Sequence, residues 1–161
     1  MPRTRLDLES LDPRLVPATV LDLTARGDQA TAPSGAIVEQ VSPQPTGTGY
    51  IRSFVRVQGA ANGGGSQQGF NTDGRPLSFD ENKSPQFTRS ITLGQVPVVT
   101  VNGTAYREFL LDINQKASSP YLSLDQVRVY LGTTGSVTSL NALGSPVFDL
   151  DAGGDVTVKL D

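Results

Sequence analysis

Apolar and polar residues alternate with a period of two along most of the chain, a pattern that predicts strands rather than helices. Val20 to Thr24 predicts a first strand, and Ala36 to Val41 predicts a second. Tyr50 to Gln58 is rich in β-branched and aromatic residues, and Phe87 to Leu93 resumes the alternation. We expect each of these runs to be a strand that turns one face toward a core.

The dipeptide Asn102-Gly103 separates two further runs of this kind, 96–101 and 104–113. Asn-Gly suits a two-residue type I′ turn, because that turn needs a positive φ at both central positions. The sequence therefore predicts a β-hairpin with a fixed register. The expected pairs are Val101 with Thr104 and Val99 with Tyr106.

Three more strands are predicted, at 126–131, 146–150 and 156–160, and no segment of the body predicts a helix. About eight to ten short strands with turns between them indicate an all-β fold, an antiparallel β-sandwich or a jelly-roll-like double sheet. We expect residues 19–161 to form one such domain and residues 1–18 to be a leader or flexible arm. The chain ends directly after a strand-like run, which leaves open whether a native continuation follows Asp161.

Composition narrows the functional classes, because the chain contains no histidine and no cysteine. Serine–histidine triads, histidine or thiolate metal sites and thiol nucleophiles are therefore excluded. The net charge of −3 comes without a basic stripe, so nucleic acid is not an expected partner. No run approaches the ~20 apolar residues of a membrane span.

The carboxylates of Asp149, Asp151 and Asp155 follow one another around two glycines in FDLDAGGD. Calcium prefers several carboxylate and carbonyl oxygens, so this cluster is a candidate metal site. It does not follow the EF-hand pattern, because Leu160 stands where that pattern needs its final carboxylate. The alternative is a tight turn between two strands with solvated aspartates. No cofactor is required by the sequence; calcium is the one it suggests.

A second candidate site is the polar stretch NTDGRPLSFDEN, which is rich in oxygen-bearing side chains. Loops held by a rigid scaffold often carry binding residues, so this stretch is a candidate ligand loop for a cation or a glycan. The alternative is ordinary turn chemistry, since Asp-Gly and Asp-Glu-Asn are both turn sequences. The candidate residues are Asn71, Asp73, Asp80, Glu81 and Asn82.

Carboxylate pairs raise the prospect of a hydrolase, because glycosidases use two carboxyl groups across a cleft. Glu108, Asp112 and Asp125 are available for such a pair. No catalytic motif surrounds them, and surface positions or polar contacts at a sheet rim account for them equally well. We therefore predict no catalytic residues.

The opening segment carries a pattern of its own, with matches at Leu8, Glu9, Leu11, Arg14, Pro17 and Ala18. It resembles the short leader of many planctomycete exported and surface proteins, roughly Leu-Glu-x-Leu-x-x-Arg-x-x-Pro-Ala. The body is similar to an uncharacterised group of proteins with this leader, in GFNTDGRPLSFDENKSPQFTRS, YREFLLDINQ and SPYLSLDQVRVYLG. The resemblance implies a secreted or cell-surface location and brings no reaction or ligand with it.

These observations together predict a non-catalytic extracellular or cell-surface module with a structural or interaction role. Its partners would be protein, either a second copy or another surface protein, or glycan, with self-association through sheet edges giving a homo-oligomer. The alternative is a calcium-assisted carbohydrate-binding module that uses the two loops above. A carboxylate-dependent hydrolase is the third hypothesis.

Overall fold

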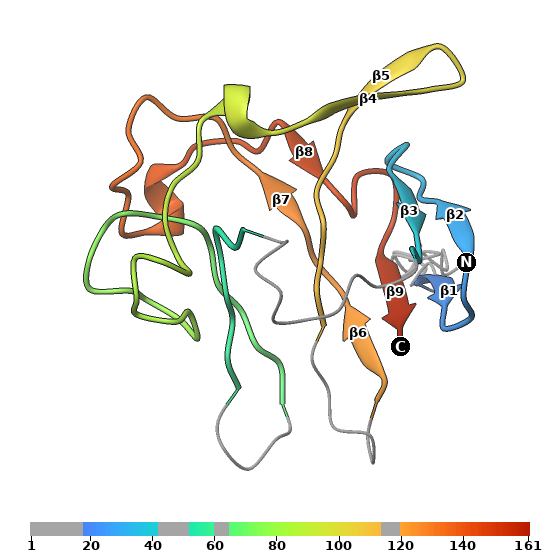
Figure 1. Ribbon diagram of the computed structural model, residues 1–161, viewed down its shortest axis with the longest axis horizontal. Helices are drawn as coiled ribbons and strands as arrows, with labels where there is room; N and C mark the ends of the chain where they lie inside the picture. The colour runs from blue at the N-terminus through green and yellow to red at the C-terminus, as the bar shows by residue number, and fades with distance from the viewer. Residues whose placement is uncertain (1–17, 42–51, 60–64, 114–119) are drawn as a thin grey trace, which may run out of the picture.

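The computed structural model of the protein describes residues 18–41, 52–59, 65–113 and 120–161 (Figure 1). Strands and loops make up this part of the chain, which contains two short 3₁₀ helices and no α-helix. None of its helices has the length and apolarity needed to cross a membrane. The strands are β1 (Thr19–Leu23), β2 (Gln29–Thr31), β3 (Ile37–Glu39), β4 (Val98–Val101), β5 (Thr104–Arg107), β6 (Leu122–Leu124), β7 (Arg128–Val129), β8 (Phe148–Asp149) and β9 (Val156–Leu160), and the 3₁₀ helices are η1 (Leu93–Gln95) and η2 (Leu140–Ala142). The all-β class predicted from the alternation is confirmed.

The largest sheet in the described residues has three strands in the order β1-β9-β6. The last strand, β9, lies in the centre, parallel to β1 and antiparallel to β6. The prediction of antiparallel pairing throughout is therefore wrong for β1 and β9. A period-two pattern specifies which side chains face the core but carries no information about strand direction, so it predicted the strands and missed this pairing.

The main core lies against this sheet and explains the alternation. Leu21 and Leu23 of β1 are buried, while their neighbour Val20 is 51% exposed. Val156 and Val158 of β9 are almost fully buried. Full burial of one such side chain contributes about 1.5–3 kcal/mol, so these few residues dominate the stability of the sheet. The whole buried cluster is Leu21, Leu23, Ala32, Leu150, Val156 and Val158.

The remaining described strands form pairs: β2 with β3, β4 with β5, and β7 with β8. The predicted Asn-Gly hairpin is confirmed, with Val101 opposite Thr104 and Val99 opposite Tyr106. Asn102 and Gly103 have φ values of 50° and 82°, as a type I′ turn requires. Figure 1 shows the β4–β5 pair as a ribbon that projects from the top of the molecule.

Two predicted strands are wrong in the residues that the structure describes. The 87–93 run contains no strand, and 52–58 contains only an isolated bridge between Val57 and Glu81; Tyr50 and Ile51 lie outside the described residues. The physical reason is that the backbone of 52–58 forms hydrogen bonds with two different segments. Arg89 N donates to Phe54 O, whereas Gln58 N donates to Asp80 O, so no continuous ladder with one partner forms.

Two parts of the molecule can therefore be distinguished. We call residues 18–41, 120–131 and 146–161 the sheet region, and residues 52–59, 65–92 and 132–139 the loop region. The buried cluster of apolar side chains belongs to the sheet region. In the loop region the buried side chains are polar, those of Thr72, Glu81 and Thr88. The predicted leader lies almost entirely in residues 1–17, outside the described residues.

Candidate functional site

The predicted metal residues lie in the turn from β8 to β9. The Asp149 carboxylate accepts a hydrogen bond from Arg128 Nε at 2.8 Å, which forms an ion pair across the β7–β8 pair, and another from Asp151 N at 3.2 Å. The Arg128 hydrogen bond holds the pKa of Asp149 below its ordinary value; partial desolvation opposes that effect. Asp151 Oδ1 in turn accepts a bond from Val156 N at 3.1 Å. The hydrogen bonds of these two carboxylates close the turn that leads from β8 into β9.

Asp155, the third predicted ligand, is exposed, and its backbone carbonyl accepts a bond from Thr19 N at 2.7 Å. Within the described ranges, no three acidic, histidine or cysteine side chains gather in a way that would hold a metal ion. The arrangement thus gives Asp149 and Asp151 a turn-closing role. Calcium binding by the three aspartates stays a prediction.

Three residues of the predicted ligand loop point their oxygens at the protein backbone. The buried Glu81 carboxylate accepts bonds from Phe70 N at 3.0 Å and Phe79 N at 2.9 Å. Asp80 accepts a bond from Gln68 N at 3.0 Å, and Asn82 accepts one from Ser84 N at 2.9 Å. Their oxygens order the loop itself, which favours the turn-chemistry alternative for these positions.

Asp73 joins two distant segments of the same region. Its carboxylate accepts bonds from both the amide and the hydroxyl of Ser90, which hold the pKa of Asp73 below its ordinary value. Next to it, the buried Thr72 hydroxyl lies 2.5 Å from the carbonyl oxygen of Val137, to which it donates. Asn71, the first residue of the predicted loop, is half-buried. The ligand-loop residues therefore form a structural network, and binding by them stays a prediction.

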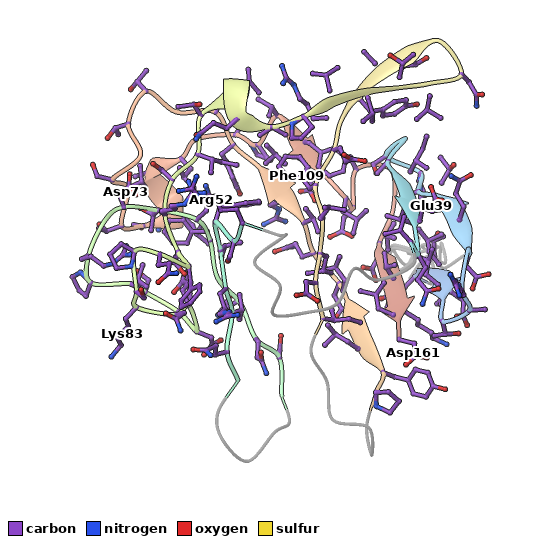
Figure 2. All side chains as sticks on the ribbon, in the orientation of Figure 1. Glu39, Arg52, Asp73, Lys83, Phe109 and Asp161 are labelled. Carbon is purple, nitrogen blue, oxygen red and sulfur yellow. The ribbon has the colours of Figure 1, made fainter. Side chains whose placement is uncertain are left out.

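The structure also contains a cleft of about 400 Å³ that was not predicted from the sequence. Three separate segments form it: residues 52–54, residues 89–97 and residues 108–110. Figure 2 shows Arg52 and Phe109, two of its lining residues, on the upper half of the molecule. The lining residues are Arg52, Phe54, Arg89, Ile91, Gln95, Val96, Pro97, Glu108, Phe109 and Leu110.

Hydrogen bonds hold the walls of this cleft. Arg89 N donates to Phe54 O at 2.9 Å, which places the first two segments side by side. On the other wall, Arg107 Nη1 donates to Val96 O at 2.7 Å and to Leu93 O at 3.2 Å. The rings of Phe54 and Phe109 meet at a centroid distance of 6.3 Å, which joins the two walls at an aromatic contact.

Charged groups line the cleft without pairing with one another. Arg52 and Arg89 contribute two guanidinium groups, and Glu108 contributes one carboxylate. Among the described residues the ion pair is Arg128–Asp149, which lies elsewhere. The sequence singled out Glu108 only as one of several carboxylates. It could not show that segments more than thirty residues apart bring the lining residues together.

The sequence matches no protein-family model, no curated protein and no solved structure. A functional assignment therefore has to come from the residues of this chain and their arrangement. Two surfaces in the described part of the chain offer such an argument, the projecting β4–β5 ribbon and the cleft lined by arginines.

Proposed function

We propose that the chain is a non-catalytic cell-surface or extracellular β-domain that acts as a structural or interaction module, and that two copies associate through the edge of β4. The observation that carries this proposal is the exposed, uncharged edge of that strand. The lack of histidine and cysteine supports a non-catalytic role. The resemblance of the opening segment to an export leader supports the location, and the β-rich fold is compatible with the sandwich that we propose for the complete domain.

The geometry of the hairpin determines which backbone groups are open. Val101 and Thr104 close the turn as a hydrogen-bonded pair, so the next pair along, Thr100 and Ala105, directs its amides and carbonyls outward. In the described residues, no backbone hydrogen bond from another segment reaches these outward groups. The ribbon therefore has two open edges, and a two-stranded ribbon is at best marginally stable by itself.

The two edges differ in their protection against pairing. β4 consists of three valines and a threonine, all β-branched and uncharged, and Val98 is 56% exposed. On β5 the corresponding edge position is Arg107, a charged residue of the kind that blocks edge pairing. We therefore assign the contact to β4. Two copies related by a twofold axis would align their β4 strands antiparallel and form a four-stranded sheet.

Light scattering after size exclusion, over a range of protein concentrations, tests this proposal. We expect the mass to rise toward twice the chain mass of 17.0 kDa. The double variant Val98→Lys/Thr100→Lys should remain monomeric, because added lysines repel across a twofold edge contact. Ala105→Lys, on the opposite edge of the same ribbon, is the matched control and should still associate. A native chain that is monomeric at every concentration contradicts the proposal.

The same measurement in calcium and in chelator addresses the alternative of a calcium-assisted module. Association through β4 needs no ion, so both conditions should give the same mass. Association in calcium alone would instead favour a role for Asp149, Asp151 and Asp155, and Asp155→Asn would be the variant to compare. Asp155 is the suitable choice, since Asp149 and Asp151 also close the turn before β9.

A further inference from the structure

The cleft is lined by arginine, aromatic and apolar residues together. Neither the fold of the chain nor the proposed contact through β4 requires this combination. Ile91, Val96, Pro97 and Leu110 give it apolar walls, and the aromatic pair of Phe54 and Phe109 also belongs to its lining. Its volume of about 400 Å³ lies at the small end of the range for ligand sites, about 300–1,000 Å³. A site of this size accommodates a few side chains, and it would exclude a bulky folded surface.

The charge balance of the cleft favours an anionic ligand. Its lining contains two arginines, Arg52 and Arg89, and one acidic residue, Glu108. Arg52 is exposed and has no hydrogen bond or ion pair within the described residues, so its donors are open. A guanidinium group binds a carboxylate through two parallel hydrogen bonds. Because apolar walls surround these donors, the best ligand has a carboxylate on an apolar body.

The backbone of residues 108–110, the segment after β5, adds a further requirement. Glu108 N is bonded to Pro97 O, whereas the amides and carbonyls of Phe109 and Leu110 take part in no backbone hydrogen bond within the described residues. Figure 1 shows this stretch as a long, nearly straight run descending from β5. Open backbone groups on a straight run suit an extended peptide, which pairs with them as an added strand. A free fatty or aromatic acid would not use them.

We propose that this cleft binds an extended peptide of a partner protein in which an aspartate or glutamate has an apolar residue two positions to either side. The acidic side chain meets Arg52 and Arg89, and the apolar side chains two positions away, which share its face of an extended peptide, contact Phe54 and Phe109. The peptide backbone pairs with the Phe109–Leu110 stretch. This interaction is independent of the proposed self-association, because β4 does not line the cleft.

Fluorescence anisotropy with a labelled, end-capped peptide of sequence Leu-Ala-Asp-Ala-Leu tests the proposal, because its leucines and aspartate share one face when the peptide is extended. We expect saturable binding, and about tenfold weaker binding of the peptide with Asn in place of Asp, the loss of one charge-assisted contact. Arg52→Gln should weaken binding of the Asp peptide by a similar factor. Glu108→Gln should strengthen it, since that change removes a like charge from the cleft.

Lys83→Gln is the matched control, because it removes one positive charge at an exposed site of the loop region, away from Phe109 (Figure 2). Equal affinities of Lys83→Gln and Arg52→Gln for the Asp peptide would overturn the proposal. Equal binding of the Asp and Asn peptides, or preferred binding of an oligogalacturonate, would overturn it as well. Repeating the titration with Val98→Lys/Thr100→Lys separates the two proposals, because peptide binding should persist in a chain that no longer associates.

Discussion

The sheet region and the loop region differ in the kind of side chain that they bury. In the sheet region the chain buries leucine and valine side chains, and Leu23, Val156 and Val158 are at most 1% exposed. In the loop region the most buried side chains are Thr72 and Thr88, at 2% and 0% exposed. The first region is stabilised mainly by removing apolar surface from water, and the second by satisfying hydrogen bonds within tightly packed loops.

Glycine shows how close that loop packing is. A Cβ added at Gly74 would lie 2.6 Å from the carbonyl oxygen of Ser136, so the two loops approach more closely than any other residue would allow. Around this contact, the side chains of Thr72, Asp73 and Arg75 form hydrogen bonds with the backbone of neighbouring loop segments. A β-rich chain can therefore hold a substantial region together by hydrogen bonds between side chains and backbone, without extended ladders.

The largest loss of stability should come from a substitution in the sheet region. Leu23→Ala removes a side chain that is 1% exposed from the main cluster, and we expect the free energy of unfolding to fall by about 2–5 kcal/mol. Val20→Ala on the same strand, at 51% exposure, should cost less than about 0.5 kcal/mol. Urea unfolding followed by circular dichroism measures both. Similar losses for the two variants would mean that β1 is not anchored by its buried face.

The corresponding change in the loop region keeps the volume and removes the hydroxyl. Thr72 Oγ1 donates to Val137 O and accepts a bond from Gly74 N at 2.9 Å, so Thr72→Val leaves buried polar groups without partners. We expect a loss of about 1–3 kcal/mol in the free energy of unfolding. Thr72→Ser keeps the hydroxyl and should lose less than the valine variant, in the same urea assay. If the valine variant is as stable as the native chain, packing rather than hydrogen bonding holds this region.

The smallest effect concerns the pH dependence of the loop region. The two Ser90 bonds lower the pKa of Asp73 in the folded chain below the ordinary value of 3.8. Since the unfolded chain keeps the ordinary pKa, this stabilisation is complete above that value and is lost as the pH falls below it toward the folded pKa. Ser90→Ala removes the hydroxyl bond and should raise the pKa of Asp73 toward its ordinary value. Carboxylate NMR shifts between about pH 6 and pH 2 measure the change; an unchanged titration curve would rule out the Ser90 hydroxyl as a cause.

The hydrophobic pattern predicted most strands of the sheet region but missed β2 and β6. It located β1 and β9 in that region and the β4–β5 hairpin outside it, because the alternation in each of them reports a half-buried strand or a specific turn. It failed for 52–58 and 87–93, where alternation is present but the backbone partners change along the segment. Alternation records that every second side chain is inside; it does not record which partner, if any, continues the ladder.

The candidate sites show a different limit. Oxygen-rich sequences predicted sites at Asp149 and around Asp80, and in the structure those oxygens bind backbone amides and Arg128. Short carboxylate and amide side chains serve turns and ligands with the same chemistry, so composition cannot distinguish the two uses. The cleft around Arg52 and Phe109 was missed because its residues come from distant segments, and only tertiary packing brings them together.

The parallel pairing of β1 with β9 has a mechanical consequence. Thr19 lies opposite Val156 and Leu23 opposite Leu160, so a force applied between Thr19 and Leu160 pulls the two strands along their length in opposite directions. The evenly spaced bonds of the parallel pair then resist together, in shear, instead of opening one after another. Under tension between these two points the β1–β9 pair bears the load, and the rest of the chain is loaded only after that pair has separated.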